Sequence, residues 1–109
     1  MALAAVDYSH NVTLYSAPVD RAAVRGIARH LGRTLLRRDF INLAESDPAE
    51  RRDLREHFLK RRLRLAHPDA ELDAAIEDVI ARMNPRQPKS RVTVCYLLAE
   101  RFDKLRLFL

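Results

Sequence analysis

Arginine is the residue type whose spacing in this chain most strongly predicts chemistry. Two sets of three arginines stand at helical spacing, so each set forms a ridge along one helix face. The six residues are Arg21, Arg25, Arg29, Arg51, Arg55 and Arg62. Like charges at this spacing destabilise a helix slightly unless an anionic group faces them. We therefore expect the two ridges to form most of any surface that binds an anionic partner, either an acidic protein or a nucleic acid.

The net charge of +5 comes from one short segment. Residues 1–50 hold six basic and six acidic residues, and residues 65–109 hold seven of each. Residues 51–64 hold seven basic residues against Asp53 and Glu56. A competing interpretation is that this charge is compensated within the chain, because five carboxylates follow at positions 69–78.

The other reactive side chains form no recognisable catalytic, cofactor or metal site. The four histidines are His10, His30, His57 and His67. They include no pair four residues apart, the spacing that would place two metal ligands on one helix face. Cys95 lies in an apolar run, where a thiol is expected to be buried and unreactive. With two glycines in total, the chain has no phosphate-binding loop, so we expect no cofactor and favour a non-catalytic role over an enzyme.

The elements that must position the arginines are predicted to be helices. Asp20 as an N-cap and a glycine stop predict a helix over residues 21–31. Residues 34–43 are apolar, and we expect a short helix there. Pro48 predicts the start of a helix that runs to about residue 63. At 100° per residue its apolar side chains fall on two arcs, which indicates packing from two sides.

Two later segments supply most of the predicted core. His67-Pro68-Asp69 should end that helix and cap the next, which carries an apolar stripe from Leu72 to Met83. Residues 91–102 are apolar nearly all round, which fits a buried strand or a buried helix. The expected heart of the core is Ile76, Val79, Ile80, Cys95, Tyr96 and Leu98. The apolar tail at residues 105–109 should dock onto this core or onto a second subunit, so a homo-oligomer stays open.

Length and composition predict one domain over residues 1–109. A content of 48% hydrophobic and 32% charged residues is typical of a globular protein. We predict an all-α fold, a compact bundle of about five helices, with no element assigned to residues 1–17. The apolar opening of the chain is too short for a signal peptide or a membrane span. The short apolar opening and the single cysteine together indicate a reducing, cytoplasmic setting.

Several segments resemble a family of small bacterial proteins known as domain-of-unknown-function family 2853. The similarity spans about residues 18–108. Its most specific parts are VRGIARHLG at 24–32, FLKRRL at 58–63, LDAAI at 72–76, KSRVT at 89–93 and YLLAERF at 96–102. The resemblance implies a compact all-helical domain and so favours a helix over residues 91–102. It implies no activity, cofactor or catalytic residue.

These observations predict a non-catalytic protein-interaction module with a basic surface. One alternative is a nucleic-acid binder that uses the arginine ridges without reading sequence, which requires both ridges on one exposed face. The chain shows no aromatic stacking platform or recognition-helix pattern in support of base readout. A second alternative is a small enzyme with a polar pocket around His30, His57 or the acidic segment.

Overall fold

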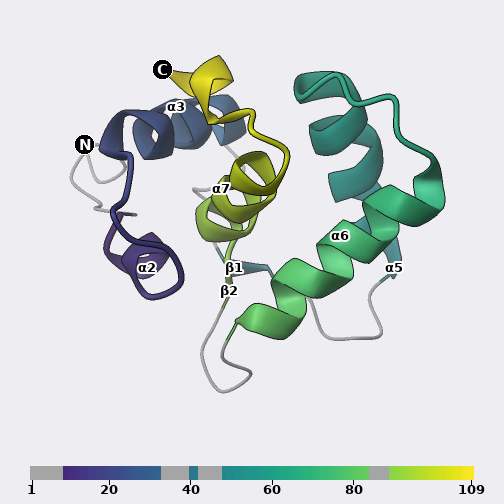
Figure 1. Cartoon of the computed structure of the whole chain (residues 1–109), viewed down its shortest axis with the longest axis horizontal. Coiled ribbons are helices and arrows are strands. Elements are labelled where there is room, and N and C mark those ends of the chain that lie inside the picture. Colours follow the sequence, from purple (N-terminus) through teal and green to yellow (C-terminus); the bar gives the residue numbers. More distant parts are fainter. Residues whose placement is uncertain (1–8, 33–39, 42–47, 84–88) are drawn as a thin grey trace.

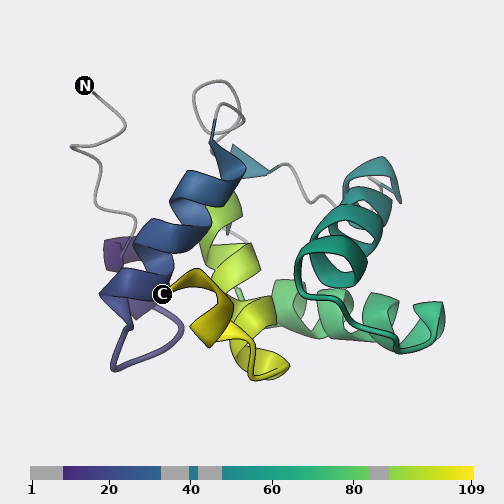
Figure 2. The ribbon, with the colours of Figure 1, turned by 90° about the horizontal axis from the view of Figure 1, so that it is seen from above.

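Helix α7 (Arg91–Arg101) runs through the middle of the fold, and the other elements pack around it (Figures 1 and 2). The computed structural model describes residues 9–32, 40–41, 48–83 and 89–109. The other elements in chain order are α2 (Ser9–Thr13), α3 (Arg21–Leu31), β1 (Phe40–Ile41), α5 (Pro48–Asp53), the π-helix η1 (Leu54–Arg62), α6 (Asp69–Arg82), β2 (Lys89–Ser90) and the 3-10 helix η2 (Leu105–Phe108). The fold is all-α, as predicted.

The segment that the sequence left open between strand and helix is the helix α7. Its residues 91–99 are all buried, so the apolar run has no solvent-facing side. α2, α3 and η2 pack against α7 on one side, and α6 lies on the other (Figure 1). The predicted heart of the core is confirmed, because its members are buried apart from the partly buried Ile80.

Helix α3 begins and ends as the sequence predicts. The Asp20 carboxylate accepts a hydrogen bond of 3.1 Å from the Ala23 N–H, which is the expected N-cap. Asp20 also donates its own N–H to the Tyr96 hydroxyl at 3.0 Å, which ties the start of α3 to α7. At the other end Gly32 takes a φ of +51° and donates its N–H to the Ala28 carbonyl.

The prediction of a short helix over residues 34–43 is wrong at its two described positions. Phe40 and Ile41 form β1, which pairs antiparallel with β2, placing Phe40 opposite Ser90. The rest of that segment lies outside the described residues. β2 directly precedes α7 in the chain, and its backbone pairs with residues 40–41. This pairing outweighs the helix propensity of those two residues.

The helix predicted from Pro48 to about residue 63 is present, but most of it is a π-helix. Leu63 donates its N–H to the carbonyl of Phe58, five residues earlier, at 2.9 Å. In that geometry side chains four and five residues apart share a face. Leu54, Phe58, Leu59 and Leu63 are therefore buried as one continuous face. The expectation of two arcs is wrong because it assumed α-helical steps.

α6 buries the apolar stripe that the sequence predicted. Leu72, Ile76, Val79 and Met83 are each at most 2% exposed. The expected cap differs in one respect: Pro68 occupies the N-cap position without a side-chain hydrogen bond, and Asp69 is the first helical residue. Acidic residues in this first turn complement the helix dipole.

The N-terminal segment, for which no element was predicted, contributes α2 to the core. Val12 is fully buried. The Thr93 hydroxyl donates to the Asn11 side-chain oxygen, and the Ser16 hydroxyl donates to Glu100 at 2.6 Å. These contacts attach the segment to one side of α7.

A buried ion pair joins the start of α5 to the start of α7. Arg91 donates to both carboxylate oxygens of Glu50, at 3.1 and 3.2 Å. The two side chains are 7% and 8% exposed. No local pattern predicted this pair, because the two residues stand 41 positions apart in the chain. Such a pair is bidentate and lies in a low-dielectric setting, so removing either side chain deprives a buried charge of a charge-assisted contact.

The C-terminal segment docks onto the core against α3, as expected of an apolar tail. Phe108 is 3% exposed, and Leu105 packs partly against the core. The approach is close enough to require glycine at position 26, where an added Cβ would lie 1.9 Å from the Phe108 carbonyl oxygen.

We expect Arg91→Leu to lower the free energy of unfolding by about 3–5 kcal/mol, because the buried Glu50 carboxylate would lose the guanidinium of Arg91. Adding Glu50→Leu should recover much of the loss. Arg101→Leu is the matched control on the same helix, since its pair with Asp78 is about half exposed and should be worth about 0–1 kcal/mol. Urea unfolding measures all three, and strictly additive losses in the double variant would contradict the pairing.

Gly26→Ala should destabilise the fold by about 1–3 kcal/mol, because the methyl group meets the backbone of Phe108. Whether the substitution lowers or raises the stability of the fold tests this contact. Glycine inside a helix costs about 1 kcal/mol relative to alanine, so without this contact the same change would stabilise α3. Thermal or urea unfolding decides between the two, and a more stable variant would show that η2 does not sit against α3.

Candidate functional site

The arginine ridge on α3 is exposed. Arg21, Arg25 and Arg29 lie on successive turns of the helix, and each is exposed. No ion pair joins any of the three to another residue in the described part of the chain. This face of α3 therefore carries three positive charges without a described counter-charge.

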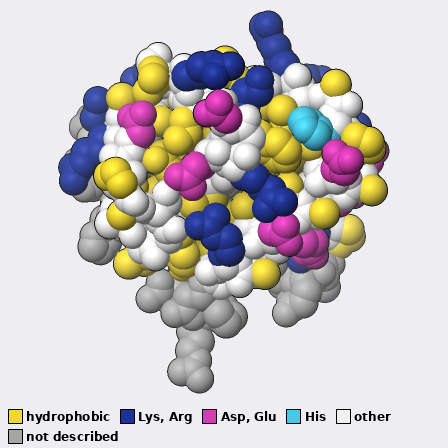
Figure 3. All heavy atoms as spheres, viewed as in Figure 1, with side chains coloured by type: hydrophobic (Ala, Val, Ile, Leu, Met, Phe, Trp, Pro, Cys, Tyr) yellow, Lys and Arg dark blue, Asp and Glu magenta, His cyan; other side chains and the backbone are white. Residues whose placement is uncertain are grey.

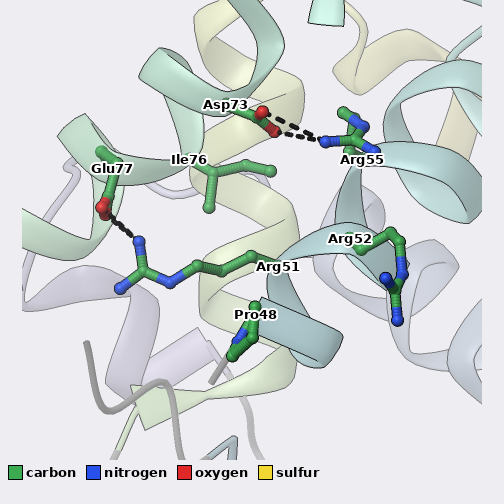
Figure 4. Close-up of a pocket in the computed structure, with 7 residues that line it drawn as sticks. All are labelled: Pro48, Arg51, Arg52, Arg55, Asp73, Ile76 and Glu77. Carbon is green, nitrogen blue, oxygen red and sulfur yellow. Dashed lines mark hydrogen bonds and ion pairs between the residues drawn. The ribbon is translucent and has the colours of Figure 1, made fainter. Parts of the chain in front are cut away.

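Two arginines of the second ridge face the acidic helix α6 instead. Arg51 is paired with Glu77, and Arg55 donates to both oxygens of Asp73 at 3.1 Å (Figure 4). Both pairs span a groove of about 370 Å³ between α5, η1 and α6. Arg52, at the rim of this groove, takes part in neither pair (Figure 4).

The pairing continues along η1 into a network. Arg55 also donates to Glu56 at 2.8 Å, and Lys60 contacts Asp69 at 2.6 Å and Glu56 at 2.9 Å. Hydrogen bonds from Arg55 and then Lys60 lower the pKa of the Glu56 carboxyl. The hydrogen bonds that Lys60 donates to Asp69 and to Glu56 raise the pKa of Lys60. This part of the positive segment thus has the internal compensation that the sequence offered as an alternative.

Acidic and basic side chains mix on the surface as a result. On the face seen in Figure 3, carboxylates lie among the Lys and Arg side chains rather than apart from them. Binding to a phosphate backbone would need a continuous positive patch, and this face does not present one.

The third member of the second ridge, Arg62, belongs to a different place. It donates to the Leu107 carbonyl at 2.9 Å, and its guanidinium carbon lies 4.3 Å from the centre of the Phe108 ring. Together with Arg29 and His30 of α3 it lines a shallow hollow of about 320 Å³. The structure therefore brings one residue of each ridge to the junction of α3, η1 and η2.

His30 sits beside aromatic rings at this junction. Its ring centre is 6.2 Å from those of Phe58 and Phe108, which stack on each other at 5.9 Å. Partial burial, and then the charge of Arg62, lower the pKa of His30. The imidazole is therefore mostly neutral at pH 7, and a nearby anion would favour its protonated form.

The junction was not foreseen as a unit. Phe58 and Arg62 stand four residues apart, and this spacing was a usable local signal for their shared side of η1. His30 and Phe108 reach the junction from distant parts of the chain, and no local spacing indicated that they would meet there.

The other candidates for catalysis or metal binding stay separate. His57 lies 3.4 Å from Asp53, and the His67 ring packs against Phe102 at 5.2 Å. The side chain of His10 lies outside the described residues. Among the described residues no three His, Cys, Asp or Glu side chains form a group that could hold a metal ion. None of the described helices has both the length and the apolar character needed to cross a membrane.

Burial raises the pKa of the Cys95 thiol to about 12. We expect no reaction with a thiol reagent in the folded protein at pH 8, and full reaction in denaturant. Above pH 9 the unfolded chain ionises first, so the free energy of unfolding should fall as pH rises towards 12. Cys95→Val should lack that slope. Rapid labelling of the folded protein would contradict the burial.

Comparison with known proteins adds one relationship. A family described as "Protein of unknown function (DUF2853)" matches residues 7–106. No curated protein matches the chain. Because the match covers nearly the whole sequence, including α2, α3, η1 and α7, the chain belongs to the DUF2853 family.

Proposed function

We propose that this chain is a non-catalytic interaction module that binds an acidic protein through the arginine ridge of α3. The observation that carries the proposal is the exposure of Arg21, Arg25 and Arg29 without a counter-charge among the described residues. Placing like charges one turn apart weakens a helix. An acidic surface laid along α3 would remove that cost and supply several charge-assisted contacts.

The contrast with η1 supports the choice of α3. Arg51, Arg55 and Lys60 stand close to carboxylates of this same chain, so a partner would have to displace those pairs. The ridge on α3 requires no such displacement. The setting we propose is the cytoplasm, in keeping with a single, buried cysteine that has no need of an oxidising compartment.

The test compares two variants of equal net charge. Arg25→Gln removes a charge from the ridge, and Arg52→Gln removes one from an exposed position on α5, distant from α3 (Figures 1 and 2). With a twelve-residue polyglutamate as probe, we expect Arg25→Gln to slow association about threefold or more at low salt, and Arg52→Gln to change it little. Stopped-flow fluorescence of labelled peptide measures both rates.

Three outcomes would overturn the proposal. Equal effects of the two variants would show a response to net charge alone. Absence of polyglutamate binding at low salt would remove the acidic partner. Tighter binding of a DNA duplex than of polyglutamate, with the affinity falling by about 0.9 in log K per log unit of salt for each phosphate contacted, would assign the ridge to nucleic acid.

A further inference from the structure

The hollow at the junction of α3, η1 and η2 combines two kinds of surface. Arg29, His30 and Arg62 supply its polar groups, and no acidic side chain is among its lining residues. The other side chains that line it are Leu107, Phe108 and Leu109. The hollow itself therefore suits an anionic group, and an apolar group would meet the leucines at its edge.

Arg62 is held in place before any ligand arrives. Its hydrogen bond to the Leu107 carbonyl and its position over the Phe108 ring fix the guanidinium at 2.9 and 4.3 Å from these partners. A guanidinium has five N–H donors arranged as a planar fork, and the bond to Leu107 uses one of them. The remaining donors can bind a carboxylate without the entropic cost of ordering a mobile side chain.

Apolar surface is exposed beside the hollow rather than within it, because the surface of the hollow itself is mainly polar. Leu107 is 38% exposed and Leu109 is 69% exposed, and both belong to the few large apolar side chains at the surface of the described residues. Exposed leucines beside two arginines gain nothing from contact with a phosphate backbone. They do gain from contact with an apolar side chain of a peptide.

We propose that this hollow is the specificity subsite of the interaction module, and that it binds a glutamate or aspartate whose neighbour in the partner is a large apolar residue. The inference rests on the proposed function and deepens it. The carboxylate lies between Arg29, His30 and Arg62, and the apolar neighbour covers Leu107. The ridge supplies attraction to any acidic surface, whereas the hollow selects acidic segments that also carry apolar side chains.

The probes are two eight-residue peptides with the same four glutamates, one with leucines between them and the other with serines. Titration followed by NMR of the histidine rings gives the affinity and identifies the site. We expect the leucine peptide to bind about fivefold more tightly or better. On binding, the pKa of His30 should rise, because the carboxylate joins the two cationic neighbours Arg29 and Arg62. The His57 and His67 signals should stay in place.

Two variants separate the subsite from the ridge. Leu107→Ser changes an exposed side chain and should abolish the advantage of the leucine peptide while leaving the affinity for the serine peptide unchanged. Arg62→Gln should weaken binding of both peptides about tenfold, the effect of losing a charge-assisted contact. Arg21→Gln, on the ridge two turns away from the hollow, should weaken both about twofold.

Four results would contradict the proposed subsite, and each has a different meaning. Equal affinities for the two peptides, with Leu107→Ser silent and Arg21→Gln effective, would overturn the subsite and leave the proposed function standing. Absence of binding by either peptide at low salt would overturn both. A shift of His30 by inorganic phosphate at lower concentration than by the leucine peptide would make this a phosphate site. A doubled mass by light scattering that falls on Leu107→Ser would show that a second copy of the chain covers the hollow.

Discussion

Burial of residues 91–99 of α7 on every side is the constraint from which the remaining structure follows. A helix without a solvent face must be enclosed by other elements, and its first residue here is a charged arginine. The cost of taking that charge out of water requires a carboxylate of matching geometry, which Glu50 provides from α5. The pair thus sets where α5 begins relative to α7, and α5 continues directly into η1. The same end of α7 adjoins β2, whose pairing with β1 places the backbone of residues 40–41 beside residues 89–90.

The π-helical geometry of η1 then decides which side chains meet. With hydrogen bonds reaching five residues back, its apolar residues merge into one buried face. Phe58, in the middle of that face, stacks against Phe108 of the C-terminal segment. Arg62 lies over the ring of Phe108 and donates to the Leu107 carbonyl. The geometry that completes the core therefore also positions a cation at the surface. π-helical turns are rare in proteins, and many of those known lie at functional sites, in keeping with the role proposed for the hollow.

Charge is distributed unevenly over this framework. α6 and η1 face each other as acidic and basic helices, and their pairs neutralise much of the most basic segment of the sequence. Net charge therefore overstates the attraction that residues 51–64 can exert on a partner. α3 has no acidic helix opposite its arginines among the described elements, and it packs through its apolar face onto α7 and η2. For this reason the proposed acidic partner is placed on the side of the molecule that carries the arginines of α3.

The sequence by itself determined the features that depend on neighbouring residues. The cap at Asp20, the stop at Gly32, the stripe of α6 and the central burial of residues 91–99 all follow from patterns shorter than about fifteen residues, where local hydrogen bonds and periodicity dominate. The end of α7 shows the limit of such rules, because Asp103 takes the left-handed conformation there without a glycine. Six arginines were recognisable as two ridges, and pairing with the carboxylates at 69–78 was one of the alternatives, but the sequence did not decide which arginines would be paired.

Tertiary structure decided everything that depends on residues far apart in the chain. Glu50 meets Arg91, Arg51 meets Glu77, and Arg62 meets the tail more than forty residues later. It also converted the two arcs of η1 into one face and residues 40–41 into a strand. The physical reason is the same in each case. Local sequence sets the preference of a segment by a fraction of a kcal/mol per residue. Burial of apolar side chains between distant segments contributes several kcal/mol and overrides it, and leaving a buried charge without its counter-ion costs a similar amount.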